Sequence, residues 1–230
     1  MLLFIKHLFS YLILFLFVAS CKKETCDANC SDIRISGKVI NASTNTGLAD
    51  IPIRVYWQDQ GICYSCPEID VGNNKTNQHG DFNFTVPADT GRFGRYGLNI
   101  EIPVPSGYIK DYTAPDNSIV YTFSQYNPSD FQNLNFILYS KTNLAIKLQR
   151  MQNENFNNFI LHYKYGSVFR SFYSYTGQPP IAVTDFNVET GANVYTKIMW
   201  TKWNGGIQIS SFIDSIKCAP TGNNSIIVNY

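Results

Sequence analysis

Apolar and polar residues alternate along most of the chain from residue 33 onward, in short segments separated by turn sequences. In 51–57, for example, every second residue is apolar, and 82–86 repeats the pattern. Successive side chains of a strand point to opposite faces, so this period predicts strands with one buried and one solvated face. The first half contains four such segments, at 33–39, 51–57, 82–86 and 98–104.

The second half has the same pattern and no stretch with a sustained helical period. Glycine-containing turn sequences such as Gly166-Ser167 and Gly205-Gly206 separate its apolar segments. One apolar and one polar face is typical of antiparallel strands in a sandwich. We therefore predict an all-β chain of tandem antiparallel β-sandwiches, Ig-like or prealbumin-like, with almost no helix after residue 20; a single larger sandwich is the alternative. The strands expected in this half are 135–139, 144–148, 159–165, 168–173, 195–203, 207–212 and 225–228.

The division into domains rests on a change of composition in the middle of the chain. Residues 111–132 are rich in Asp, Asn, Ser, Tyr and Pro, which is typical of a connection. We expect a first sandwich at 33–110, a linker at 111–132 and a second sandwich at 133–230, with a boundary near 130–140. The alternative for the linker is that it contains an edge strand.

The first twenty residues follow a different pattern. They carry one basic residue, Lys6, and no acidic one, and Leu12–Val18 is unbroken hydrophobic sequence. A basic start, a short apolar stretch and a small-residue end describe a secretory signal. A membrane-spanning helix is the alternative, but it needs about 20 apolar residues, and Lys6, His7 and Ser10 interrupt this run. We expect residues 1–20 to be a signal peptide.

The signal ends on Val18-Ala19-Ser20-Cys21, which resembles the lipobox of bacterial lipoproteins. The resemblance implies cleavage before Cys21, lipidation of Cys21 with a diacylglyceryl group and an acyl chain such as palmitate, and membrane attachment through that lipid. Residues 21–32 are then a tether. Residue 22 is Lys and not the Asp that retains many lipoproteins at the inner membrane. The resemblance therefore implies the outer membrane, with the protein facing either the periplasm or the outside.

Three segments of the first half follow one another in a recognisable order. They are Gly37-Lys38-Val39-Ile40, then Thr46–Val55, then Thr76–Phe84 with His79-Gly80-Asp81 at its centre. In this order they resemble the carboxypeptidase regulatory-like, or transthyretin-like, sandwich family over about residues 33–110. Leu48-Ala49 stands where the family usually has Pro-Leu, and Asn77 stands where it often has Asp. The resemblance implies a β-sandwich that serves as a binding or folding accessory, and it brings no active site.

Charge argues against one class of partner. The chain has 18 Lys+Arg and 17 Asp+Glu, and of these only Lys6 lies within residues 1–20. The remaining part is therefore neutral, with 17 basic and 17 acidic residues. A neutral chain offers no general electrostatic attraction for nucleic acid, so we expect no nucleic-acid partner.

Five cysteines remain once Cys21 is assigned to the lipid. Disulfides persist in an oxidising envelope compartment, so two bridges and one free thiol, Cys218, are expected. The Cys63-Tyr64-Ser65-Cys66 spacing is also that of a redox motif, and two such close pairs suit a four-cysteine zinc site. The loop position and the compartment favour disulfides, so we expect no metal and no cofactor. The disulfide candidates are Cys26, Cys30, Cys63 and Cys66.

Catalytic chemistry has little support in the sequence. After the signal, the histidines are His79, in a turn, and His162, on a predicted strand. Neither lies in a pattern of Ser, Cys or carboxylate residues that indicates a triad or a metal cluster. Scattered acidic residues need only meet in space to form a glycosidase pair, but chance accounts for those present. We predict no catalytic residues and a protein that is not an enzyme.

Aromatic residues are the remaining candidates for contact with a ligand. Tyr and Trp rings stack on sugars or anchor protein partners, although most such rings pack inside. We predict a non-enzymatic outer-membrane lipoprotein that binds an envelope protein or has a structural role. The alternative is a glycan-binding accessory lipoprotein that works beside a transporter or hydrolase. The candidate contact residues are Tyr112, Tyr126, Tyr173, Tyr175 and Trp203.

Overall fold

The computed structural model describes residues 30–61, 67–111, 117–149, 151, 156–166, 168–176 and 184–230. This part of the chain is almost entirely strand, which confirms the predicted all-β fold class. It contains two short 3-10 helices, η1 (Thr90–Arg92) and η2 (Pro128–Phe131), and no α-helix. None of its helices is long and apolar enough to cross a membrane. The strands are β1 (Cys30–Asn41), β2 (Thr46–Gly47), β3 (Pro52–Asp59), β4 (Ile69–Lys75), β5 (Asp81–Asp89), β6 (Tyr96–Pro103), β7 (Tyr108–Lys110), β8 (Ser118–Phe123), β9 (Leu134–Gln149), β10 (Asn158–Tyr165), β11 (Val168–Thr176), β12 (Thr184–Gly191), β13 (Tyr195–Asn204), β14 (Ile207–Lys217) and β15 (Asn224–Asn229).

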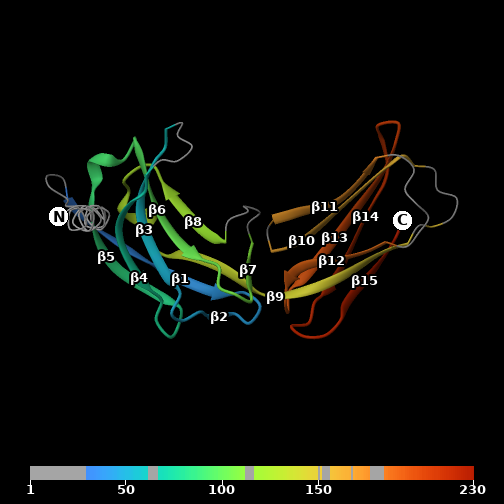
Figure 1. Ribbon diagram of the computed structural model, residues 1–230, viewed down its shortest axis with the longest axis horizontal. Coiled ribbons are helices and arrows are strands. Elements are labelled where there is room, and N and C mark those ends of the chain that lie inside the picture. Colours follow the sequence, from blue (N-terminus) through green and yellow to red (C-terminus); the bar gives the residue numbers. More distant parts are fainter. Residues whose placement is uncertain are drawn as a thin grey trace, which may run out of the picture.

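The strands form three sheets, which Figure 1 shows as two halves along the long axis of the molecule. A seven-stranded sheet, which we call the long sheet, has the order β12-β9-β1-β2, with β5 also paired to β1 and with β7 and β15 also paired to β9. The four-stranded sheet β4-β3-β6-β8 shares a core with it in the N-terminal half, and β11-β10-β13-β14 does so in the C-terminal half. Each half is thus a two-layered sandwich. Most pairings are antiparallel, but β1–β9 and β15–β9 are parallel.

Strand β9 belongs to both halves. Its first residues, Leu134 to Leu138, pair with β1, and its later residues pair with β12 and β15. Even-numbered residues of β9 are mostly buried, whereas odd-numbered residues mostly face solvent. Both cores therefore lie on the same side of one strand. The first core receives Leu134, Phe136 and Leu138, and the second receives Leu144, Ile146 and Leu148.

The halves meet at the middle of β9, around Tyr139 and Ser140. Tyr139 packs edge-on against Tyr165 of β10, with ring centroids 5.5 Å apart. Ser140 contacts both halves, because its Oγ accepts a hydrogen bond from Asn41 Nδ2 at 3.0 Å and its carbonyl oxygen accepts one from the Ala192 amide at 2.8 Å. These contacts tie the start of the second half to the end of β1.

The segment 111–132, expected as a linker, contributes to the first sandwich where the structure describes it. Its residues Ser118–Phe123 form β8, which pairs with β6 at the edge of a sheet, so the edge-strand alternative applies. Alternate residues of β8 are apolar, and Ile119 and Phe123 pack against the first core. The expected tether at 21–32 also ends earlier, because β1 begins at Cys30 and pairs with β5 from that residue.

Two turns of the N-terminal half require glycine. A Cβ on Gly47 would lie 1.8 Å from the carbonyl oxygen of His79, and a Cβ on Gly80 would lie 2.5 Å from that of Val39. Gly80 also has a φ of 77°, in the left-handed region that favours glycine. The two turns therefore pack backbone against backbone. This contact gives a physical reason for the Thr46-Gly47 and His79-Gly80-Asp81 sequences that does not depend on the family resemblance.

Candidate binding surfaces

The edge strand β14 leaves large apolar side chains in solvent. It is the last strand of the β11-β10-β13-β14 sheet, so one side of its backbone has no neighbouring strand among the described residues. Ile207 is 73% exposed, Ile213 is 65% exposed and Ile209 is 52% exposed. Isolated apolar residues are normal on a protein surface, but a contiguous group marks an interaction site. We therefore treat β14 as a candidate protein interface.

The sheet extends one strand beyond its own core at β14. Ile198 and Trp200 of β13 are buried, whereas their cross-strand neighbours Asp214 and Phe212 are exposed. Phe212 stacks on Trp200, with ring centroids 5.5 Å apart and an interplanar angle of 18°. The apolar pattern of the core face thus continues onto β14, but no layer of the described chain covers it there.

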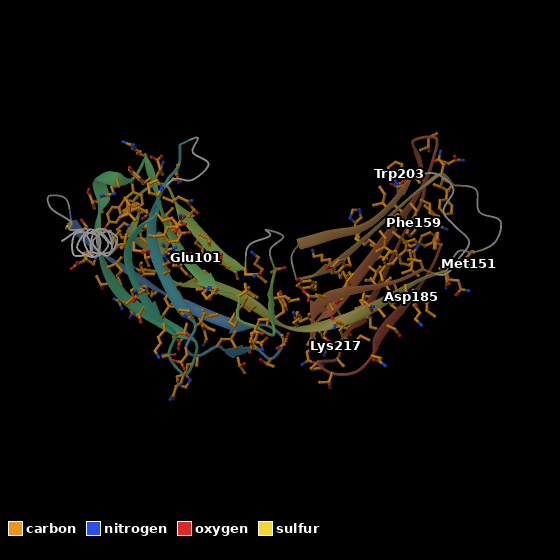
Figure 2. The ribbon with its side chains drawn as sticks, viewed as in Figure 1. Glu101, Met151, Phe159, Asp185, Trp203 and Lys217 are labelled. Carbon is orange, nitrogen blue, oxygen red and sulfur yellow. The ribbon has the colours of Figure 1, made fainter. Side chains whose placement is uncertain are left out.

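The solvent face of β13 and β14 carries a second row of apolar side chains. Ile213 pairs with Met199, and Trp203 pairs with Gln208, with a bulge that leaves Ile209 as the extra residue of β14. Trp203 and Lys217 mark opposite ends of these two strands (Figure 2). The buried Nε1 of Trp203 has no hydrogen-bond partner. Both faces of the β14 edge are therefore partly apolar.

Two of the other edge strands have features that discourage the addition of a further strand, and two more, β8 and β15, lack proline and charge but are only six residues long. β5 contains Pro87, and β12 carries Asp185 and Glu189. Proline and charged side chains are common protection for sheet edges. β14 has neither within Ile207–Ile213, and at 11 residues it is longer than β5 with nine or β12 with eight. Among the described edge strands, β14 is the longest, so it offers the most backbone to an added strand.

A shallow groove of about 400 Å³ lies on the solvent face of the long sheet in the N-terminal half. Its walls include the ion pair between Lys38 and Asp81, whose nearest atoms are 3.4 Å apart. The side-chain amides of Asn133 and Asn135 line it and make no hydrogen bond within the described chain. The groove therefore offers free amide donors and acceptors beside the ion pair between Lys38 and Asp81.

A second shallow groove, of about 310 Å³, lies on the long sheet in the C-terminal half. Strand β9 lines both grooves, with Asn135 in the first and Asn143 and Lys147 in the second. All three are odd-numbered residues of β9 and share the face opposite both cores. Asn187 and Asn223 add further amides to the second groove.

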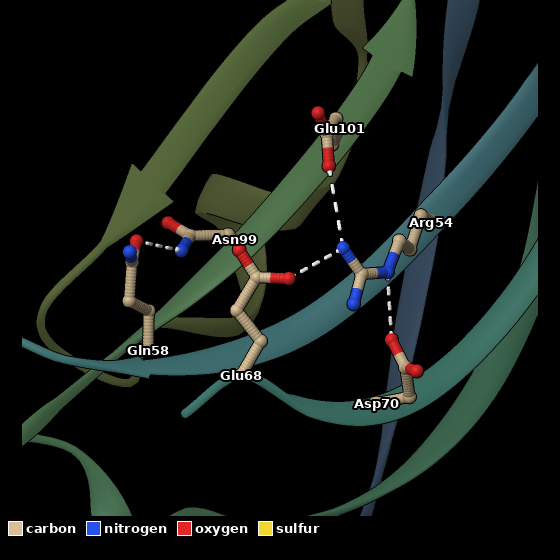
Figure 3. A network of polar contacts seen from close by, with 6 residues as sticks. All are labelled: Arg54, Gln58, Glu68, Asp70, Asn99 and Glu101. Atoms are coloured by element: carbon tan, nitrogen blue, oxygen red, sulfur yellow. Dashed lines mark hydrogen bonds and ion pairs between the residues drawn. The ribbon is translucent and has the colours of Figure 1, made fainter. Parts of the chain in front are cut away.

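Arg54 organises the solvent face of the β4-β3-β6-β8 sheet (Figure 3). Its Nε lies 2.7 Å from Asp70 Oδ1, and its Nη1 lies 2.6 Å from Glu68 Oε2 and 3.8 Å from Glu101 Oε2. Burial lowers the pKa of Arg54, but hydrogen bonds to Asp70 and Glu68 outweigh this effect and raise it above its ordinary value. The guanidinium also lies over the ring of Tyr56, 4.4 Å from its centroid.

Beneath this network, Tyr56 and Asn99 are buried on the solvent-facing side of the sheet. Burial is the main cause that raises the pKa of Tyr56 to about 12. Asn99 Nδ2 donates to Gln58 Oε1 at 3.0 Å, and Thr122 Oγ1 donates to Asn99 Oδ1 at 2.6 Å. These polar groups satisfy one another, so the network stabilises the sheet face and leaves few groups free for a ligand.

The structure separates the predicted contact aromatics. Tyr126 is exposed and packs against Phe93, with ring centroids 5.7 Å apart, at the end of the first sandwich. Trp203 is half-buried beside β14. The side chains of Tyr173 and Tyr175, on β11, and all of Tyr112 lie outside the described residues. Tyr126 and Trp203 belong to different halves, so the described rings form no common platform. Sequence reasoning missed the exposure of Ile207, Ile209 and Ile213.

Of the cysteines beyond the signal, Cys218 is free and buried, as the odd number of cysteines predicts. Burial raises the pKa of its thiol, and a hydrogen bond between this thiol and the Thr196 hydroxyl opposes the effect. Cys30 is disulfide-bonded, with a partner outside the described residues. Cys21, Cys26, Cys63 and Cys66 also lie outside them, so their roles stay predictions.

Among the residues that the structure describes, His, Cys, Asp and Glu form no group of three or more that could hold a metal ion. His79 lies in the turn before β5, and His162 lies on β10 opposite Met199. The two histidines thus belong to different halves of the molecule.

No protein-family model matches the chain. No curated protein matches it either. Among solved structures, it is similar to the TIE protein of Bacillus anthracis, with 12% identity, a TM-score of 0.28, and 86% of this chain but only 32% of that chain covered. It is also similar to the shaft pilin SpaA of Lactobacillus rhamnosus GG (10% identity, TM-score 0.29, 87% and 97% covered) and to a streptococcal ancillary pilin (9%, 0.30, 88% and 63%). Likeness at this level leaves function to be argued from the surfaces described above.

Proposed function

We propose that this chain is a lipid-anchored, non-enzymatic module of the bacterial cell envelope that docks a protein partner by strand addition to β14. The observation that carries the proposal is the group of exposed isoleucines on an edge strand whose outer side has no neighbouring strand among the described residues. An edge strand presents unpaired N–H and C=O groups to an added strand, and alternate side chains supply specificity. The partner is therefore a protein with an extended, partly apolar segment.

The lipid anchor at Cys21 and the outer-membrane location are part of the proposal, and their support is the lipobox-like sequence Val18-Ala19-Ser20-Cys21. β1 begins at Cys30, a short distance after Cys21, and β14 lies in the other half of the molecule (Figure 1). With a lipid on Cys21, the N-terminal half is the membrane-proximal one. β14 is then presented by the half that lies further from the anchor.

The proposal also assigns the first half to the carboxypeptidase regulatory-like sandwiches. Its support is the order of the three sequence segments together with the close packing of Gly47 against His79 and of Gly80 against Val39. In this assignment the first half is a spacer and folding unit, and the second half carries the interface.

A photo-reactive side chain at position 213 tests the docking surface. We expect irradiation of cells that express the full chain with a benzoylphenylalanine in place of Ile213 to give a discrete protein adduct, because Ile213 lies on the edge strand to which the partner is proposed to add. The matched control is the same substitution at Ile137, which is also an exposed isoleucine but lies on β9. Adducts of equal yield at both positions, or none at position 213, contradict the proposal.

A second candidate function, glycan binding, is favoured by the two amide-lined grooves on the long sheet. An asparagine side chain offers both donors and an acceptor, which suits the hydroxyl groups of a sugar. The free amides of Asn133 and Asn135 lie beside the Lys38–Asp81 pair, and no large exposed ring lines this groove. The ligand would therefore be held by hydrogen bonds with little stacking, and we expect weak binding of a neutral glycan.

Truncation of one groove amide tests this second function. We expect Asn135→Ala to weaken the binding of the full chain to a glycan array several-fold, because one hydrogen bond contributes about 0.5–1.5 kcal/mol. Asn229→Ala, at an exposed asparagine of β15 outside both grooves, serves as control and should leave binding unchanged. Silence of the unmodified protein across the array rejects glycan binding.

A further inference from the structure

We propose that the partner at β14 is a second copy of this chain, added antiparallel across a two-fold axis that passes beside Ser211. The inference rests on the proposed docking function of β14 and names the occupant of that same edge. In a two-fold dimer the same surface is used by both copies, so the strand must be complementary to itself. β14 meets this requirement in its sequence, in its charges and in the side chains beside it.

The sequence of β14 is self-complementary about Ser211. In an antiparallel pair centred there, each residue faces the one at the same distance on the other side of the centre. Ile209 of one copy then faces Ile213 of the other, and this apolar pair occurs twice. Ser210 faces Phe212, and Ser211 faces its own equivalent. Cross-strand pairs of β-branched residues stabilise a sheet by about 0.2–1 kcal/mol each.

The neighbouring strand β13 extends each apolar pair into a row. Met199 lies beside Ile213 within one copy, and Trp203 lies next to the bulge that contains Ile209. Across the two-fold axis, the row of apolar side chains runs from Met199 and Ile213 of one copy to Ile209 and Trp203 of the second copy. Two such rows of four apolar side chains are related by the axis. The row covers Ile209 and Ile213, which are more than half exposed in the single chain.

The charges of β14 fit the same register. The charged residues of the strand are Asp214 and Lys217. Asp214 lies at the level of Gln208 of the second copy, whose side-chain amide is a neutral donor suited to a carboxylate. Lys217 lies at the level of Gly205, beyond the end of the facing strand. No like charges of β14 face each other, so the pairing avoids the repulsion that protects other edges.

A cysteine at the two-fold axis gives the sharpest test. In the proposed register the two residues at position 211 face each other, and cross-strand Cα separations of about 4.5–5.5 Å lie within the range that a disulfide spans. We expect the full-length Ser211→Cys protein to form a disulfide-linked dimer in the cell envelope, seen as a band of doubled mass on a non-reducing gel. Adding Ile213→Lys to Ser211→Cys should reduce this band strongly, because it places a charge within the apolar pair.

Ser215→Cys is the matched control, because Ser215 is exposed on the same strand. The two residues at position 215 are eight residues apart along the proposed pair, or about 27 Å, which is far beyond the span of a disulfide, so they should give only a small fraction of the dimer formed at position 211. Equal dimer yields at 211 and 215, or no dimer at 211, overturn the inference. The benzoylphenylalanine adduct at position 213 separates this outcome from failure of the docking function. An adduct whose mass is not that of two copies keeps the function and rejects the second copy.

Discussion

Gly47→Ala is expected to lower the free energy of unfolding by about 3 kcal/mol or more, at the upper end of what overpacking costs. The new Cβ would lie 1.8 Å from the carbonyl oxygen of His79 and 2.3 Å from its carbonyl carbon. Both atoms are backbone, so no rotamer change relieves the contact. The turn that contains Gly80 must move instead, and the hydrogen bond from the Val39 amide to the Gly80 carbonyl, 2.9 Å long, moves with it.

The measurement is thermal unfolding of the full chain, followed by circular dichroism. For a chain of this size about 1 kcal/mol corresponds to about 2–4 °C in Tm, so we expect a fall of about 6–12 °C. Gly61→Ala is the control, because among the described residues its Cβ would meet only the Asp59 side chain, at 3.1 Å from Oδ1, and no backbone atom. An unchanged Tm for Gly47→Ala would show that the two turns do not pack as described.

Cys21→Ala is expected to abolish lipidation completely. The thiol of Cys21 is the group that would carry the diacylglyceryl chain, and alanine has no nucleophile to replace it. Each buried methylene of a lipid contributes about 0.8 kcal/mol to membrane binding. Because residue 21 of this variant has no thiol to carry the lipid, we expect no incorporation of labelled fatty acid. We also expect a precursor that keeps residues 1–20 and migrates more slowly on a gel.

Cys26→Ala is the control for this experiment, because Cys26 is a cysteine of the same N-terminal segment outside the lipobox-like sequence. It should be labelled and processed as the unmodified chain is. Membrane retention alone does not decide the question, since an uncleaved apolar signal also holds a protein at the membrane. Fatty-acid labelling of the Cys21→Ala protein at the normal level would overturn the lipoprotein assignment.

Strict alternation was sufficient to predict most strands. β3 and β10 have apolar residues at every second position over most of their length, and both are central strands whose inner face is buried. β4 was not predicted, because its sequence Ile69-Asp70-Val71-Gly72-Asn73-Asn74-Lys75 has only two large apolar residues. Its pairing with β3 and the ion pair between Asp70 and Arg54 hold it in the sheet, and a local pattern does not contain these distant partners.

The exposure of the apolar side chains of β14 could not be predicted from the sequence, for a related reason. The alternation of Ile207, Ile209 and Ile213 resembles that of a buried strand, and residues 207–212 were expected to be an ordinary sandwich strand. Whether such side chains are buried depends on the layer that covers them, and β14 lies beyond that layer. The sequence also did not predict that one strand, β9, lies under both cores, because its two halves were predicted as separate strands at 135–139 and 144–148.

The parallel pairing of β1 with β9 has a mechanical consequence. Gly37 to Asn41 lie beside Leu134 to Leu138, and β1 starts at the end of the molecule nearest the proposed anchor. A pull between the anchor and β14 passes from β1 into β9 across these lateral hydrogen bonds, because β9 leads into the second half. Bonds loaded across their direction share the tension and must break together, whereas the bonds of a peeled hairpin break one at a time. Survival under tension is set by an unfolding rate rather than by equilibrium stability, so we expect this junction to slow the unfolding of a chain that is stretched between the anchor and β14.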